Sequence, residues 1–217
     1  MNLTLWEQLL KQLNNRWEDL LSSMGMHIEL VLLSMLIAIV VGVPLGIIVT
    51  RIPSLQSWII GGAGILQTIP SLALLGFMIP IFGIGMNTAI AALFLYSLLP
   101  IIRNTYTGIK DVDQATIEAA RGMGMTDMQI LFKVQLPLAL SVIMAGIRTS
   151  TVINVGTATL AAFIGGGGLG DFIFLGISRN IDALILLGAV PAAILALLLD
   201  YLLGVTEKWT TPRGLKK

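Results

Sequence analysis

Long apolar runs constrain the fold of this sequence more than any other feature. A helix needs about 20 apolar residues to cross the hydrocarbon core of a bilayer. Five runs approach or exceed that length, and they cover residues 28–49, 58–81, 86–102, 136–164 and 183–205. The chain is 56% hydrophobic and 12% charged, about half the charge of an average soluble protein. The sequence therefore predicts an all-α integral membrane protein with five transmembrane helices in one domain, residues 26–210.

Charge and residue content exclude several classes of function. Lysine and arginine number 13 against 12 acidic residues, so there is no basic surplus for binding nucleic acid. No cysteine and one histidine leave neither a disulfide framework nor a thiolate or imidazole metal site. The GxxxxGK[ST] phosphate loop is absent as well, so any ATP hydrolysis would take place in a separate chain. We therefore expect no catalytic residue, cofactor or metal in this chain.

The first segment, residues 1–25, carries charges such as Glu7 and Lys11 and lacks the pattern of a signal peptide. Its apolar residues recur at helical spacing along one stripe, which predicts an amphipathic helix. One interpretation places this helix in the membrane interface, where Trp6 and Trp17 suit the headgroup level. The other packs it on the protein's own spans. His27, which follows, is expected to be solvated near the start of the first span.

Lysine and arginine are distributed unequally between the two faces of a five-span topology. Nine of them fall on one face and three on the other, with Arg148 inside a span. Because the cytoplasmic side holds the excess, the amino terminus is predicted outside and the tail, residues 206–217, in the cytoplasm. The protein would then be a multi-pass membrane protein, and residues 103–135 would form its largest cytoplasmic loop.

That cytoplasmic loop carries the signals of two short helices. Asp111 or Asp113 can cap the first, and Gly122 with Gly124 would interrupt it. A capping box, Thr126 followed by Gln129, predicts a second helix that continues to Leu136 and Pro137. A short, rigid projection continuous with a membrane span can transmit force from a cytoplasmic partner.

The loop also resembles a known family. Its motif residues are Glu118, Ala119, Ala120, Gly124, Val134, Leu136 and Pro137. This pattern is similar to the EAA loop of bacterial ABC-importer permeases, the inner-membrane components of binding-protein-dependent transport systems, with valine in place of isoleucine at position 134. In that family the loop forms a coupling helix that docks on the ATPase. The resemblance implies an ATPase-coupling role here for Glu118, Ala119, Ala120, Gly124, Leu136 and Pro137.

The resemblance extends over about residues 30–204 and includes the segment GGGGLG at 165–170. It is strongest to permeases for osmoprotectants such as glycine betaine, carnitine and choline, whereas methionine-importer permeases share the same five-span fold. It implies a cytoplasmic ATPase that holds ATP and Mg²⁺, a second permease that is a sister chain or a copy, and an extracellular or periplasmic substrate-binding protein. The glycine-rich segment would meet that binding protein, or would let two helices pack closely.

Candidate pathway residues are the polar side chains inside the apolar spans, since these are costly in lipid. Ser150, Asn154 and Thr157 share one helical face, which suits either a pathway or hydrogen bonds between helices. Gln67 and Ser71 flank Pro70, whose missing amide hydrogen predicts a kink in the second span.

Arg148 is a further pathway candidate, about 16 Å along its span from Pro137. A charge at that depth needs a partner, and Glu29, Asp171 or carbonyl groups at a helix break are the candidates. Two other functions remain open: a membrane scaffold that gathers an ATPase without moving solute, and an ion-coupled transporter. The second would ordinarily carry more spans and an intramembrane carboxylate network.

Overall fold

The computed structural model describes residues 4–210, which form an all-helical structure. The helices are α1 (Leu5–Arg51), α2 (Gln56–Thr68), α3 (Ser71–Phe82), α4 (Met86–Lys110), α5 (Gln114–Gly122), α6 (Asp127–Ile130), α7 (Leu136–Ala158), α8 (Gly170–Arg179) and α9 (Asp182–Thr210). Short turns of 3-10 helix cover Pro53–Leu55 and Thr159–Ile164, and a π-helical turn covers Leu131–Gln135. Four helical segments are long and apolar enough to cross a membrane, those of α1, α4, α7 and α9.

A fifth span depends on how α2 and α3 are counted. The predicted span 58–81 is not one kinked helix, because α2 and α3 meet at an angle of 105°. Proline restricts the residue before it to an extended conformation, and Ile69 has φ −68° and ψ 128°. The hydroxyl of Tyr96 donates a 2.7 Å hydrogen bond to the Ile69 carbonyl, which satisfies the backbone at the break. The pair is therefore a broken span or a re-entrant segment.

Helix α1 joins the predicted amphipathic segment to the first span over 47 residues, with non-helical dihedral angles only at Arg16. Leu20 is buried beside Leu169 and Phe172, so this part of the segment packs on the protein's own helices. Trp6 and Trp17 are exposed, as residues at a membrane interface would be. The packing interpretation therefore applies to the part around Leu20, and the interfacial one stays a prediction.

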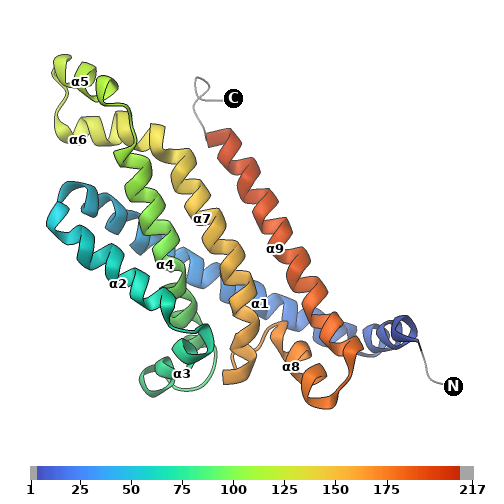
Figure 1. Ribbon diagram of the computed structural model, residues 1–217. Coiled ribbons are helices and arrows are strands. Elements are labelled where there is room, and N and C mark those ends of the chain that lie inside the picture. The colour runs from blue at the N-terminus through green and yellow to red at the C-terminus, as the bar shows by residue number, and fades with distance from the viewer. Residues whose placement is uncertain (1–3, 211–217) are drawn as a thin grey trace.

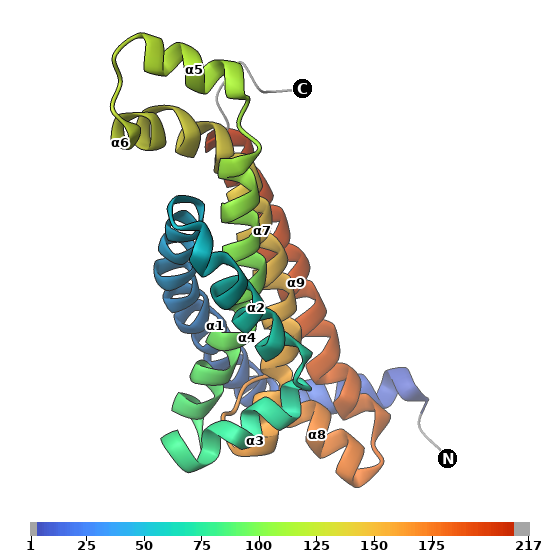
Figure 2. The same ribbon diagram turned by 60° about the vertical axis from the view of Figure 1, so that its left-hand side comes forward.

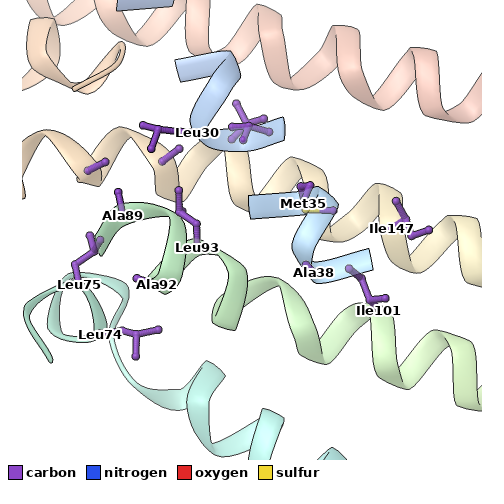
Figure 3. Packing of buried hydrophobic residues seen from close by; sticks show 14 of the residues in the cluster. Leu30, Met35, Ala38, Leu74, Leu75, Ala89, Ala92, Leu93, Ile101 and Ile147 are labelled. Atoms are coloured by element: carbon purple, nitrogen blue, oxygen red, sulfur yellow. The ribbon is translucent and has the colours of Figure 1, made fainter. Parts of the chain in front are cut away.

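The core lies where α1, α4 and α7 pack together and α3 closes one side (Figure 3). Small residues allow the closest approach, and Gly42 and Gly46 form a GxxxG pattern on the face of α1 that meets α4. A Cβ atom at Gly46 would lie 2.5 Å from Cβ of Thr105. No larger residue fits there without moving one of the two helices.

The two ends of the bundle differ (Figures 1 and 2). Helices α5 and α6 project from one end, here called the coupling end, and α3 and α8 lie at the other. Helix α9 packs along α7 and reaches the coupling end. The predicted tail therefore begins as helix, since α9 extends through Thr210, and residues 211–217 fall outside the described part.

Candidate coupling and translocation site

The projecting element follows the local signals of its sequence. The side chain of Asp113 caps α5 by accepting a hydrogen bond from the Ala115 amide, which identifies Asp113 as the cap rather than Asp111. The chain turns after Gly122, with Gly124 at φ +81°, a conformation that favours glycine. Thr126 and Gln129 form the predicted capping box at the start of α6. An ion pair of 3.3 Å between Arg121 and Asp127 links the two helices.

The predicted ATPase-coupling residues divide between two faces of this element. Glu118, Ala119 and Gly124 are exposed, whereas Ala120, on the inner side of α5, is buried. The exposed surface also carries large apolar side chains, namely Met123, Met128 and Phe132. Exposed large apolar side chains together with an exposed acidic residue on one projecting element suit a protein partner. Ala120 supports this surface from below and makes no part of it.

A half-buried hydrogen-bonded clamp, which the sequence did not indicate, ties the element to the bundle. Gln135, in the π-helical turn between α6 and α7, accepts a 2.6 Å hydrogen bond from the Arg51 guanidinium at the end of α1. Its amide nitrogen donates to the Ile109 carbonyl at the end of α4. Leu136 and Pro137 follow directly as the first turn of α7. The clamp therefore links the ends of three long helices at the base of the coupling element.

Ser150 and Asn154 lie in a buried polar network between α1, α4 and α7. The Asn154 amide donates to the hydroxyls of Ser97 at 2.7 Å and Ser34 at 3.1 Å, and Ser150 donates to the Ser97 carbonyl. All four residues are at most 2% exposed. These contacts correspond to interhelical hydrogen bonding, and a pathway role for Ser150 and Asn154 stays a prediction.

Thr157 and Ser71 come together at a small recess. They line it with Tyr96, where it offers about 10 Å³, roughly room for one water molecule. Tyr96 is the residue whose hydroxyl bonds the α2–α3 break, so the recess adjoins that break. Gln67 is half-buried at the end of α2. The bend thus places Ser71 beside the α7 residue Thr157, although 86 positions separate them in the sequence.

Arg148 has partners other than those expected. Its guanidinium forms a two-pronged ion pair with Asp200 of α9, with N–O distances of 2.6 and 2.8 Å, and a contact of 3.4 Å with Glu207. Glu29 and Asp171 do not pair with it. Asp200 is the lone charge inside the last apolar run. The sequence therefore did contain a signal for this pair, namely opposite charges inside two predicted spans.

His27 is not solvated, contrary to the expectation from its position. Its side chain is fully buried, with Nε2 3.1 Å from the Val155 carbonyl and Nδ1 accepting from the Leu169 amide at 3.4 Å. A Cβ atom at Gly168 would lie 3.0 Å from His27 Nδ1. The glycine-rich segment therefore packs closely against the first long helix, which favours that interpretation of its glycines. A meeting with a binding protein stays a prediction.

The apolar spans and the EAA-like projection agree with the class that the sequence predicts, the permease subunits of ABC importers, and the comparisons with known proteins show that class. The chain belongs to the family of binding-protein-dependent transport system inner membrane components, whose sequence model matches residues 42–213. It is 49% identical to the glycine betaine/carnitine/choline transport system permease OpuCB of Bacillus subtilis, over 96% of both chains. It is 51% identical to the choline transport system permease OpuBB of the same organism, over 88% of both.

A solved structure supports the fold. An inward-facing form of the MetNI methionine ABC transporter matches with a TM-score of 0.79 and 26% identity, covering 89% of this chain and 96% of the other. The predicted methionine-permease-like all-α fold is confirmed, with four or five spans according to how α2 and α3 are counted. The protein is thus a multi-pass membrane permease.

Proposed function

We propose that this chain is the permease subunit of an ATP-driven importer for small osmoprotectants with a quaternary ammonium group, such as glycine betaine, carnitine or choline. The observation that carries the proposal is the 49% identity, over 96% of both chains, to a permease named for those three compounds. ATP and Mg²⁺ bind in a separate ATPase chain, and this chain carries out no chemistry of its own.

The ATPase docks on the exposed face of α5 through Glu118, Ala119 and the apolar side chains beside them. Its closure pushes the coupling element, and the push reaches the membrane because the π-helical turn runs directly into α7. The clamp at Gln135 passes the same movement to the ends of α1 and α4. A change in the tilt of these helices exposes the pathway alternately to the two sides.

The pathway runs beside the break between α2 and α3. Gln67, Ser71 and Thr157 provide polar groups there, and a broken helix near the middle of the membrane is common at transporter sites. Ser150 and Asn154 fix the helices behind this surface. A second permease, a sister chain or a copy, completes the enclosure, and a binding protein delivers solute from outside. The coupling end faces the cytoplasm of a bacterial cell, and the amino terminus lies outside.

A second candidate is a permease for methionine or a related amino acid. It is favoured by the structural match to a methionine transporter, which extends over 96% of that chain. Measurements of solute uptake distinguish the osmoprotectant permease from the amino-acid permease. Labelled glycine betaine, carnitine, choline and methionine are supplied at low and high osmolarity to cells with and without this chain. Loss of salt-stimulated betaine or carnitine uptake on deletion supports the osmoprotectant proposal, whereas loss of methionine uptake alone overturns it.

The coupling role is tested by reversing one charge. Glu118→Lys should abolish uptake while the protein stays in the membrane, because the exposed carboxylate meets the ATPase. The control is Glu18→Lys, which makes the same change on an exposed glutamate of the amino-terminal segment and should leave uptake intact. Unchanged uptake in the Glu118 variant would overturn the coupling role, and a scaffold without transport would show no solute uptake at all.

A further inference from the structure

An ion-paired cluster joins the middle of α7 to α9. The guanidinium of Arg148 donates from Nε and Nη2 to the two carboxylate oxygens of Asp200, at 2.6 and 2.8 Å, and from Nη1 to Glu207 at 3.4 Å. Two parallel bonds between planar groups fix the orientation of the partners as well as their distance. At this level α7 therefore cannot slide or rotate against α9 without breaking a charge-assisted bond.

Apolar packing is open on both sides of this cluster. A groove of about 220 Å³ lies on the side toward α1, and Ile147, Leu199 and Leu203 are among the residues that line it. A recess of about 270 Å³, lined by α7 and α9 alone, contains the cluster itself. Helices are ordinarily held in register by closely packed side chains, and a void removes those contacts. Ion pairs, rather than interdigitated apolar side chains, therefore bridge α7 and α9 at this level.

Gly204 lets the guanidinium lie directly against α9. A Cβ atom at this position would be 3.2 Å from Cζ of Arg148, which is closer than ordinary contact. Asp200 precedes Gly204 by four residues and Glu207 follows it by three, so the cluster extends over about two turns of α9. A contact of that length resists tilting of one helix relative to the other.

Helix α9 is also fixed at its far end, beside α8 and the glycine-rich segment (Figure 1). Gly188 approaches the backbone there, since a Cβ atom at this position would be 2.5 Å from the Leu169 carbonyl oxygen. Leu184 packs with Leu169 and Phe172 in an apolar cluster. Between these contacts and Asp200, α9 is a continuous helix. A displacement at Asp200 therefore reaches the end of the bundle that lies opposite the coupling element.

We propose that the bonds from Arg148 to Asp200 and Glu207 form a mechanical tie, here called the α7–α9 tie, through which α9 follows α7. The inference rests on the proposed function, because the transmitted movement begins at the coupling element and enters α7 through the π-helical turn. The clamp at Gln135 links that turn to α1 and α4, and the tie adds α9. Arg148 and Asp200 are thus positioning residues that make ATP hydrolysis move solute without meeting the solute themselves.

Replacing both charges of the pair distinguishes a tie from an ion pair that only stabilises the fold. Asp200→Leu alone should lower the unfolding temperature, because it breaks one side of a half-buried pair. The double variant Arg148→Met/Asp200→Leu removes both charges, so its unfolding temperature should return close to that of the wild type. In proteoliposomes that hold the complete transporter with its binding protein, this double variant should lose about fivefold in glycine betaine uptake and keep ATP hydrolysis within about twofold.

A covalent bridge between the two positions gives a rescue experiment, because the natural chain contains no cysteine. Arg148→Cys/Asp200→Cys should take up solute slowly. A bifunctional thiol reagent that joins the two cysteines should restore uptake, whereas a monofunctional reagent of the same chemistry should not. Wild-type transporter treated in parallel reports any effect on thiols of the other subunits. The bridged variant tests the tie even if the apolar pair fails to fold.

The matched control is Arg179→Met/Asp182→Leu, which makes the same two changes on exposed residues at the junction of α8 and α9 and should leave uptake intact. Wild-type uptake in Arg148→Met/Asp200→Leu would overturn the tie, since stability alone would then explain the ion pair. Equal losses of uptake and ATP hydrolysis, or no rescue in a bridged sample, would also overturn it. Wild-type transporter that takes up no glycine betaine, carnitine or choline would instead overturn the proposed function.

Discussion

The Asn154 amide shows how one side chain can hold three helices in a membrane. It donates to serine hydroxyls on α1 and α4 from its position on α7. Asn154→Leu removes these bonds and places a branched apolar group among polar ones. We expect a loss of about 1–2 kcal/mol, the range for interhelical hydrogen bonds, measured as a lower unfolding temperature in detergent. Thr149→Val, on the exposed side of the same helix, is the control. Normal stability combined with altered solute preference would indicate a pathway role instead.

Gly46 marks the closest approach of α1 to α4. Gly46→Leu requires the helices to separate, because even a Cβ atom there would lie 2.5 Å from Thr105. Overpacking of this kind costs about 1–3 kcal/mol. The matched control is Gly62→Leu on α2, where a Cβ atom meets nothing within 4 Å. The unfolding temperatures of the two variants check the expectation, and equal values would contradict the close packing.

Residue-level roles were predictable from sequence only where the cause is local. The caps at Asp113 and Thr126 depend on neighbours within three positions, so the sequence pattern predicted them. The partner of Arg148 lies 52 positions away, and its identity depends on how α7 and α9 are rotated about their axes. The solvent exposure of His27 was predicted wrongly for a similar reason, because its partners Val155 and Leu169 lie in distant segments of the sequence.

At the scale of elements, the connection between α6 and α7 determines how the projection can act on the bundle. A Gln135→Leu variant loses the bonds to Arg51 and to the Ile109 carbonyl, so the projection would move with less effect on α1 and α4. We expect solute uptake to fall several-fold while ATP hydrolysis by the assembled transporter persists. Both activities can be measured on the same proteoliposomes.

A double-variant cycle identifies the Arg51–Gln135 bond as the cause. Arg51→Met alone should reproduce the uptake loss, and the pair of substitutions together should cost little more than either one, because each already removes the shared bond. Fully additive losses would show that the two side chains act separately. A parallel loss of ATP hydrolysis would show a defect in docking rather than in transmission.

Elements were predicted from sequence where hydrophobic length and capping determine them. The long helices α1, α4, α7 and α9 follow from apolar runs of membrane length. The 105° break between α2 and α3 was underestimated, since Pro70 indicates a kink but not its angle. That angle depends on Tyr96, which bonds the freed backbone from another helix. The π-helical turn at 131–135 likewise has no local signature, and its residue Gln135 bonds a carbonyl of another helix.

At the scale of the whole molecule, polar and charged groups are distributed unevenly along the bundle. The projection formed by α5 and α6, with its exposed acidic and apolar side chains, lies at one end, and the tightly packed glycine-rich segment lies at the other (Figure 1). The ion pair between Arg148 of α7 and Asp200 of α9 lies in between, nearer to the coupling end. A single orientation in the membrane places the coupling surface where an ATPase can reach it.

The orientation itself is open to a direct test, because the natural chain contains no cysteine. Met123→Cys and Ile84→Cys each introduce one thiol at an exposed position, 75% and 77% exposed, at opposite ends of the bundle. In intact cells a membrane-impermeant thiol reagent should label the Ile84 variant and not the Met123 variant, since the proposed orientation places the coupling end in the cytoplasm. Opening the membrane should make both react. Ala89→Cys, at a fully buried position, should resist labelling until the protein is denatured. Labelling of the Met123 variant in intact cells would show that the coupling end faces outward. A cytoplasmic ATPase could then not reach α5.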